Sequence, residues 1–165
     1  MTGFPAVRPR RLRRTPALRR LTAVTSVRGS DLVLPLFVKE GISEPQPVPS
    51  MPGVVQHTRD SLRKAAAEAA EAGVGGLILF GIPAVKDARG SAADDPAGIS
   101  QLALADAQAE VGDAMVIMAD LCLCEYTDHG HCGVLTASAD VDNDATRSAR
   151  HSGRGRCTHT GTGPP

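Results

Sequence analysis

The sequence predicts an α/β fold in which a mostly parallel sheet is covered by helices. Three short segments are almost wholly apolar (residues 32–38, 76–80 and 114–119), and two segments with helical character (61–72 and 99–111) separate them. Strands without polar alternation are buried on both faces, which is typical of parallel sheets packed against helices. Alternation alone leaves open whether such a sheet closes into a barrel or stays open.

The first strand and the first helix have distinct local signals. Leu32–Val38 is rich in β-formers, and its single proline fits best near an edge or an irregularity. Residues 41–54 contain four prolines and two glycines, so we expect a loop there. Thr58 can cap a helix over Ser61–Ala72, whose alanines are spaced for one buried face, and Gly73 suits its C-terminal cap.

The second half of the alternation leads to the most polar part of the sequence. Gly76–Phe80 is the second expected strand, residues 86–98 form a polar loop, and Ile99–Val111 is a helix ended by glycine. Ala114–Ala119 is the third strand and runs directly into Asp120. Because chemistry gathers at the C-terminal ends of parallel strands, we expect the functional site there.

The net charge of zero conceals three zones. Residues 1–30 hold eight arginines and no acid, residues 31–146 hold all eighteen acids against six basic residues, and residues 147–165 hold four arginines and no acid. This distribution predicts a basic N-terminal arm, an acidic globular body and a separate basic tail.

The basic arm has two interpretations. Seven arginines lie between Arg8 and Leu21, interrupted by Pro9 and Pro16, and would attract phosphates. No aromatic residue lies among them to stack on bases, so we favour an extended arm that packs on a partner subunit over nucleic-acid binding. No apolar run approaches the roughly 20 residues of a membrane helix, and a signal-peptide core is lacking. We therefore expect a cytoplasmic protein without membrane contact.

Three of the four cysteines, Cys122, Cys124 and Cys132, lie within eleven residues, beside His129 and His131. Thiolates bind zinc well, and a Cys-x-Cys pair on an extended chain points both sulfurs to one side. Three ligands would leave a fourth position open, as in a catalytic zinc site. Redox thiols, cysteines that merely fill the core, and a closed structural site completed by a histidine remain alternatives.

The string Asp-Leu-Cys-Leu-Cys-Glu-Tyr-Thr-Asp-His-Gly-His-Cys-Gly over residues 120–133 resembles the metal segment of zinc-dependent porphobilinogen synthases (delta-aminolevulinic acid dehydratases). Further segments resemble this family in the same order, over residues 8–146 in all: 10–14, 34–38, 49–53, 86–91 and 96–98.

The resemblance implies a TIM (β/α)8 barrel, of which residues 31–146 would form the first three βα units, and a homo-octamer in which the arm wraps a neighbour. It also implies condensation of two 5-aminolevulinate molecules to porphobilinogen, with loss of two waters, in tetrapyrrole and haem biosynthesis. Cys122, Cys124 and Cys132 match the zinc ligands, and Asp120 matches an acidic residue near the active site. A simple strand-end hydrogen-bond acceptor is the alternative for Asp120.

The lysines that form Schiff bases in this family lie on later strands, and none of Lys39, Lys64 and Lys86 matches their motifs. No catalytic residue is therefore assigned, and we expect these lysines at the surface. An incomplete barrel would expose its inner face and the edge of its third strand. We expect the chain by itself to be aggregation-prone and inactive. The alternative function is a non-catalytic zinc-binding fragment that associates with an intact homologue.

The tail after Thr146 departs from the family pattern. Residues 147–165 contain one alanine and no Leu, Ile, Val or Phe, which predicts a disordered segment. Cys157 and His159 within it could bind a metal, but we interpret them as incidental. Out-of-frame translation or a truncated gene would explain the change, and the nucleotide sequence around codon 146 would decide between them.

Overall fold

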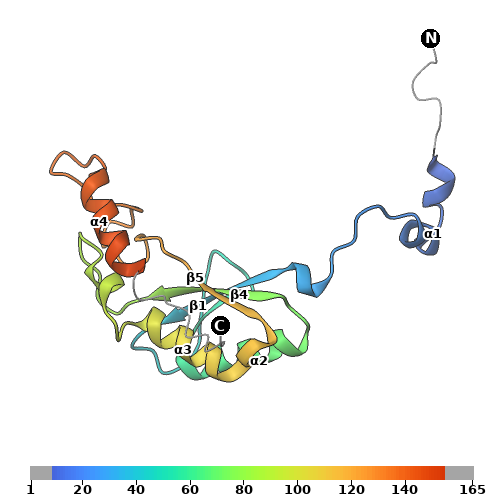
Figure 1. Cartoon of the computed structure of the whole chain (residues 1–165), viewed down its shortest axis with the longest axis horizontal. Coiled ribbons are helices and arrows are strands. Elements are labelled where there is room, and N and C mark those ends of the chain that lie inside the picture. Colours follow the sequence, from blue (N-terminus) through green and yellow to red (C-terminus); the bar gives the residue numbers. More distant parts are fainter. Residues whose placement is uncertain (1–8, 155–165) are drawn as a thin grey trace, which may run out of the picture.

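A five-stranded sheet organises residues 9–154, the part of the chain that the computed structural model describes (Figure 1). Its strands lie in the order β2-β3-β1-β4-β5, with β3, β1, β4 and β5 parallel and β2 antiparallel to β3. In chain order they are β1 (Val33–Lys39), β2 (Gln46–Pro47), β3 (Val55–His57), β4 (Gly76–Ile82) and β5 (Val116–Ala119). The predicted α/β class, with a mostly parallel sheet, is confirmed.

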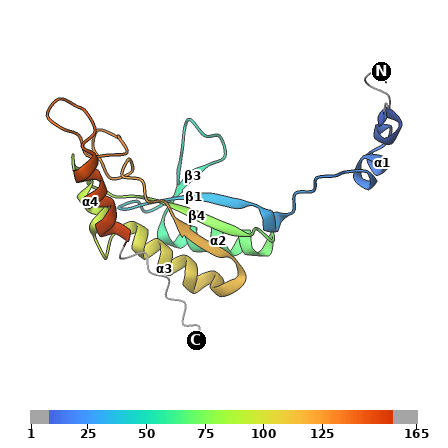
Figure 2. The same cartoon turned by 45° about the horizontal axis from the view of Figure 1, so that its top comes forward.

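Two helices lie together against one face of this sheet. Helices α2 (Arg59–Glu71) and α3 (Ile99–Val111) connect β3 to β4 and β4 to β5, and both lie on the same side in two views (Figures 1 and 2). Strands β1, β4 and β5 lie side by side in the sheet, in the order in which they occur along the chain. Such one-sided winding differs from a doubly wound sheet, which carries helices on both faces.

The capping residues and glycines identified in the sequence mark most ends of the two helices. The Thr58 hydroxyl accepts the Ser61 backbone N–H at the start of α2, and Gly73 follows that helix with φ +74°. Helix α3 has the expected bounds, whereas α2 begins two residues earlier than expected. Residues 112–114 form a 3₁₀ helix (η4, Gly112–Ala114), so β5 starts later than the apolar pattern predicts.

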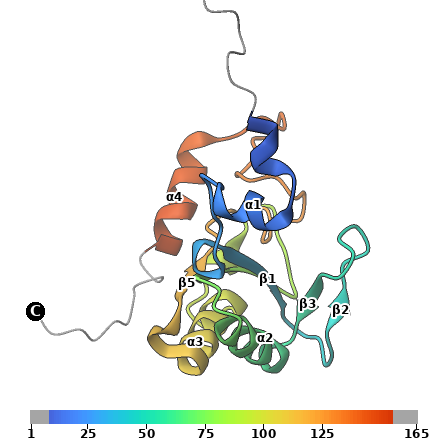
Figure 3. The same cartoon turned by 90° about the vertical axis from the view of Figure 1, so that its right-hand side faces the viewer.

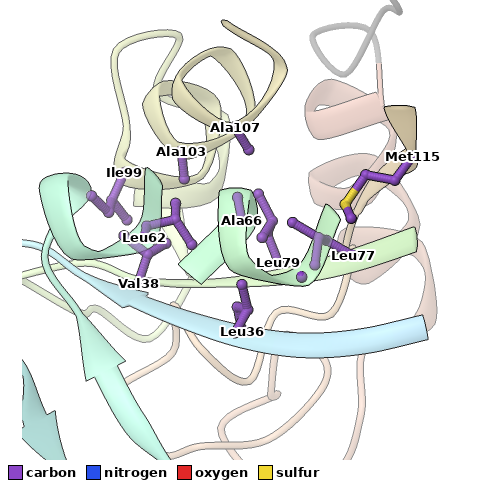
Figure 4. Close-up of a cluster of buried hydrophobic side chains, with 11 residues drawn as sticks. Leu36, Val38, Leu62, Ala66, Leu77, Leu79, Ile99, Ala103, Ala107 and Met115 are labelled. Atoms are coloured by element: carbon purple, nitrogen blue, oxygen red, sulfur yellow. The ribbon is translucent and has the colours of Figure 1, made fainter. Parts of the chain in front are cut away.

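The core lies between the sheet and these two helices (Figure 4). Side chains from alternate positions of β1 and β4 meet one face of each helix, where alanines allow a close approach. The cluster consists of Leu36, Val38, Leu62, Ala66, Ala69, Leu77, Leu79, Ile99, Ala103, Ala107 and Met115. On the opposite face of the sheet Phe37 and Phe80, paired in register, are half-buried with ring centroids 5.2 Å apart.

A buried charge cluster joins α2 to α3. Asp106, whose side chain is 8% exposed, accepts two hydrogen bonds from Arg59, at 2.6 and 2.9 Å, and one from Arg63 at 2.5 Å. The Arg59 guanidinium, aided by Arg63, lowers the pKa of the Asp106 carboxyl despite its burial. We call these three residues the α2–α3 clamp.

Two short strands lie outside the expected alternation. β3 follows the Pro/Gly-rich loop and pairs parallel with β1 through Phe37 opposite Gln56 and Val38 opposite His57. β2 falls within the segment expected to be loop and pairs with β3. Figure 3 shows both at one edge of the sheet. Runs of two and three residues are too short to give a periodic signal.

The basic arm is not simply extended. It contains a 3₁₀ helix (η1, Pro9–Arg13) and α1 (Pro16–Leu21), held away from the sheet (Figures 1 and 2). Thr15 caps α1 by accepting the Leu18 backbone N–H. Pro16 occupies the first turn, where its missing N–H costs nothing, so this proline starts a helix where an interruption was expected.

The tail also differs from expectation over its first residues. Helix α4 (Asn143–Arg154) continues through residues 147–154, which were expected to be disordered. Its start is capped because Asp142 Oδ1 accepts the backbone N–H groups of Asp144 and Ala145. Residues 155–165, with Cys157 and His159, lie outside the described residues. Within residues 9–154 no helix has the length and apolar character needed to cross a membrane.

Candidate metal centre

The cysteine segment begins where β5 ends. The Asp120 backbone N–H continues the ladder by donating to the Leu79 carbonyl at 3.0 Å. The Asp120 carboxylate then accepts the Cys122 backbone N–H at 3.1 Å. This places the first cysteine at the C-terminal end of the sheet, as predicted.

The chain then turns instead of staying extended. The backbone N–H groups of Tyr126 and Thr127 both donate to the Leu123 carbonyl at 2.9 Å. Leu123, Tyr126 and Thr127 are buried, which anchors the turn, while Cys122 and Cys124 remain half-buried. The predicted convergence of the Cys122 and Cys124 sulfurs is confirmed, but the chain bends at Leu123 instead of holding the Cys-x-Cys pair extended.

The turn and the return of the chain bring all three thiols together. The sulfur atoms of Cys122, Cys124 and Cys132 all lie within 4.8 Å of one another. Cys132 is exposed, so the group opens to solvent on that side. A second group, formed by one atom each of Asp120, Cys122 and Glu125, meets the same distance limit and shares Cys122.

The side chains of both histidines form hydrogen bonds with backbone groups of the surrounding loops. His129 Nδ1 accepts the His131 backbone N–H at 3.1 Å. The proton of this imidazole therefore lies on Nε2, which donates to the Ala88 carbonyl at 3.2 Å. His131 Nδ1 accepts the Gly133 backbone N–H at 3.2 Å. Among the described residues, the compact donor groups contain no histidine.

The loop after β4 supports the cysteine segment. Asp87 and Thr127 form an isolated parallel bridge, in which the Asp87 N–H donates to the Tyr126 carbonyl and the Asp128 N–H donates to the Asp87 carbonyl. The Asp87 carboxylate in turn accepts from the Ser91 hydroxyl, from the Ser91 N–H at 3.0 Å and from the Arg89 N–H at 3.0 Å. These bonds lower the pKa of Asp87, the Ser91 hydroxyl contributing most.

The electrostatics of the thiols differ within the cluster. Burial opposes ionisation of Cys122, but hydrogen bonds from the Cys124 backbone and from the thiols of Cys124 and Cys132 outweigh it and lower the pKa of Cys122. Burial raises the pKa of the Cys124 thiol well above its ordinary range, reinforced by its hydrogen bonds to Cys122 and Glu125. The protein therefore favours one thiolate and disfavours its neighbour.

The three lysines are partly or fully exposed. Lys39, at the end of β1, donates to Gln46 Oε1 at 3.1 Å. Lys64 on α2 and Lys86 after β4 are exposed. None of the three lines the small pocket beside the cysteines, whose walls include Ser100, Asp120, Cys122 and Tyr126.

The comparisons with known proteins agree with this geometry. A sequence model of the delta-aminolevulinic acid dehydratase family matches residues 6–155. The chain belongs to the delta-aminolevulinic acid dehydratase family. The match extends beyond Thr146, where the family pattern was expected to end.

Relatives named delta-aminolevulinic acid dehydratase include that of Streptomyces coelicolor, 62% identical over 146 residues, and that of Mycobacterium tuberculosis, 62% identical over 148 residues. These matches cover 87% and 88% of this chain, but only 44% and 45% of the relatives. The chain thus spans less than half the length of the dehydratases that it matches.

A solved structure supports the same family. The crystal structure of delta-aminolevulinic acid dehydratase (porphobilinogen synthase) from Toxoplasma gondii, in complex with the reaction product porphobilinogen, matches with a TM-score of 0.77 and 29% identity. The match covers 89% of this chain and 42% of that chain.

Several residues that build this dehydratase-family site had no predicted role. Gly81 admits the first turn of α3, since a Cβ there would lie 1.9 Å from Ser100 Oγ. The Ser100 hydroxyl thereby reaches the Tyr126 hydroxyl. The Asp87-to-Ser91 spacing, typical of an aspartate that accepts backbone N–H groups ahead of it, points to the supporting loop, as does the resemblance of residues 86–91 to the family.

Proposed function

We propose that this chain forms the metal-binding side of a delta-aminolevulinic acid dehydratase active site. The reaction would condense two 5-aminolevulinate molecules to porphobilinogen with loss of two waters. One observation carries the proposal: three thiols that converge within 4.8 Å at the C-terminal end of a parallel strand. Family membership, shown by the match over residues 6–155, supplies the reaction.

The donor chemistry fits Zn²⁺. Thiolates suit this borderline-soft ion, and three protein ligands leave the fourth tetrahedral position for water or substrate. Cys122, Cys124 and Cys132 would hold the ion. A bound zinc ion would supply Lewis-acid polarisation of a substrate oxygen. None of these three cysteines forms a disulfide in the described part of the chain, which supports the proposed reducing, cytoplasmic location.

The chain's own residues prepare this site. Asp120 orients the Cys122 backbone and faces the small pocket, where its carboxylate can hold or move a proton. Ser100 and Tyr126, joined through their hydroxyls, line the same pocket. Glu125 has one buried carboxylate oxygen, Oε2, without a hydrogen-bond partner in the described part of the chain. A cation beside Cys122 would offset the cost of burying that oxygen.

The Schiff-base side of the reaction needs lysines that these 165 residues do not supply. The chain covers 44% of its Streptomyces relative, which leaves room for them elsewhere in a full-length dehydratase. We further propose that the one-sided α/β sheet is the first part of a (β/α)8 barrel, and that the arm packs on a neighbouring subunit of an octamer.

A chimera tests the proposed reaction. Residues 1–146 of this chain would replace the aligned part of the Streptomyces coelicolor dehydratase. We expect the chimera to convert 5-aminolevulinate to porphobilinogen, while the 165-residue chain alone gives none. A folded, zinc-loaded chimera without turnover would contradict the proposed reaction, and turnover by the 165-residue chain would contradict the need for the missing lysines.

Zinc stoichiometry tests the metal centre independently of turnover. The 165-residue chain should hold one zinc ion, and Cys124→Ala should hold much less. Ser138→Ala is a matched control, because Ser138 lies in an exposed turn away from the sulfurs. If the Cys124→Ala variant retains the full zinc content, the three-cysteine assignment is wrong.

The second candidate is a non-catalytic zinc-binding protein that associates with an intact homologue. It is favoured by the positions of Lys39, Lys64 and Lys86, none of which lines the pocket beside the cysteines. A chimera that binds zinc without turnover would support this candidate over the first.

A further inference from the structure

Thr127 occupies a special position in the cysteine segment. It lies between the Cys-x-Cys pair and Cys132, and it is 1% exposed, whereas each of the three cysteines is exposed to some degree. Its backbone is held on two sides. Its N–H donates to the Leu123 carbonyl at 2.9 Å, and the residue forms the bridge to Asp87. The backbone around Thr127 is therefore fixed by the turn and by the supporting loop.

The Thr127 side chain links this fixed backbone to the residue that precedes the third cysteine, Cys132. Its hydroxyl donates to the His131 carbonyl at 2.9 Å. That carbonyl belongs to the peptide group that leads directly into Cys132. A hydrogen bond to it sets the orientation of this peptide and so the direction in which the Cys132 side chain leaves the backbone.

The residues on either side of Cys132 hold it in place through their own hydrogen bonds. Cys132 itself is exposed, and the backbone N–H groups on either side of it, those of His131 and Gly133, are bound by the imidazoles of exposed histidines. The Thr127 hydroxyl links this stretch, before Cys132, to a buried and doubly anchored residue, and after Cys132 the Val134 N–H donates to the buried Thr146 hydroxyl at 2.9 Å. A buried hydroxyl that lost the acceptor it has in the His131 carbonyl would be left without a hydrogen bond, which destabilises the folded state.

We propose that Thr127 is a positioning residue for the metal ligand Cys132: its hydroxyl holds the third sulfur in place for zinc. The inference rests on the proposed zinc site and adds to it a residue that touches neither metal nor substrate. Partners that orient metal ligands typically change metal affinity by about 10–100-fold when they are removed. Thr127 acts through the peptide group of its ligand in the same way.

Zinc affinities of Thr127→Val and Thr127→Ser, measured on the full 165-residue chain by competition with a chromophoric chelator, test this role. Valine keeps the branched shape and loses the hydroxyl, so we expect zinc Kd to rise about 10–100-fold. Serine keeps the hydroxyl and loses the methyl group that lies near Gly90, so we expect a Kd near that of the unaltered chain. Thr58→Val is the matched control. It removes the cap of α2 and should lower the thermal midpoint without changing zinc Kd.

Cobalt absorption and a double-mutant cycle separate positioning from general destabilisation. In Thr127→Val the sulfur-to-cobalt charge-transfer band should fall part of the way toward the level of Cys132→Ala. Adding Thr127→Val to Cys132→Ala should change zinc Kd little, because Thr127 acts through the ligand that Cys132→Ala removes. An unchanged Kd in Thr127→Val, or a full loss that persists in the Cys132→Ala background, would overturn the proposal.

Two further outcomes are informative. If Thr127→Val does not fold, Thr127→Ser tests the proposal. Retained zinc affinity supports a role for the hydroxyl. A loss of about 10–100-fold in zinc affinity assigns the effect to packing of the methyl group and overturns the proposal. If the unaltered chain holds no zinc, the proposed metal centre itself fails, which is distinct from a chain that binds zinc with or without the Thr127 hydroxyl.

Discussion

The α2–α3 clamp and the cysteine cluster both gather ionisable groups, but they satisfy them in opposite ways. In the clamp, the Asp106 carboxylate accepts three hydrogen bonds from two guanidinium groups of the same chain. In the cluster, burial has the largest effect on the pKa values of Cys122 and Cys124, and the groups that act beside it are other thiols, one backbone N–H and the Glu125 carboxylate. The clamp carries its own cations, whereas ionising all three thiols requires a positive charge from outside the chain.

This difference separates a structural charge cluster from a ligand site. A buried charge that is paired within the protein stabilises one arrangement of two helices and leaves nothing for a ligand. A half-buried group of like donors is unfavourable until a cation joins it. Substitutions in the clamp should therefore change the free energy of unfolding, and substitutions in the cluster should change metal affinity.

The largest expected effect is on zinc binding, for Cys122→Ser. Zinc sites in small domains bind with about 10–16 kcal/mol. Losing one of three ligands should remove roughly a third of this, about 4 kcal/mol, which weakens Kd about 1000-fold. The thermal midpoint of the metal-free chain should barely move. Competition titration and calorimetry check both values, and a large loss of metal-free stability would contradict the contrast with the clamp.

The clamp should give the reverse result. Asp106→Asn leaves two arginines without their carboxylate, and breaking a buried pair typically costs about 3–5 kcal/mol. The arginine side chains are 43% and 39% exposed, so solvent screening reduces the expected loss to about 2 kcal/mol. Denaturant unfolding measures it, and zinc Kd should stay unchanged.

Asp60→Asn is the matched control for the clamp. Asp60 lies on α2, as Arg59 and Arg63 do, and also pairs with Arg63, at 3.0 Å. Its side chain, however, is 85% exposed. We expect a change of about 0.5 kcal/mol or less. Equal losses for the two substitutions would show that burial of Asp106 is not what matters.

The sequence predicts the two regions unequally well. The sheet, α2 and α3 follow from apolar runs and helical spacing, and the cysteine cluster follows from residue type. The clamp could not be predicted, because Arg59 and Asp106 are 47 residues apart and depend on how α2 packs on α3. Thr127 was visible in the motif, but its role depends on the direction of one hydroxyl. Helix α4 was missed because its capping by Asp142 outweighs a composition that predicts disorder.

Acid should gradually remove the contribution of Asp106 and sharpen the comparison further. The folded pKa of Asp106 is lowered by Arg59, while the unfolded value stays near 3.9. Stability from this group is thus fully present above the unfolded pKa and is lost as pH falls through the lower, folded pKa, by at most about 1.4 kcal/mol per pH unit. The free energies of unfolding of the metal-free chain and of Asp106→Asn should therefore differ at pH 7 and converge below pH of about 4. Denaturant unfolding across this range checks the result. A difference that persists at low pH would mean that Asp106 acts through hydrogen bonds that do not need its charge, since asparagine keeps the shape of the side chain. The contrast between a self-neutralised clamp and a cation-dependent cluster would then lose its electrostatic basis.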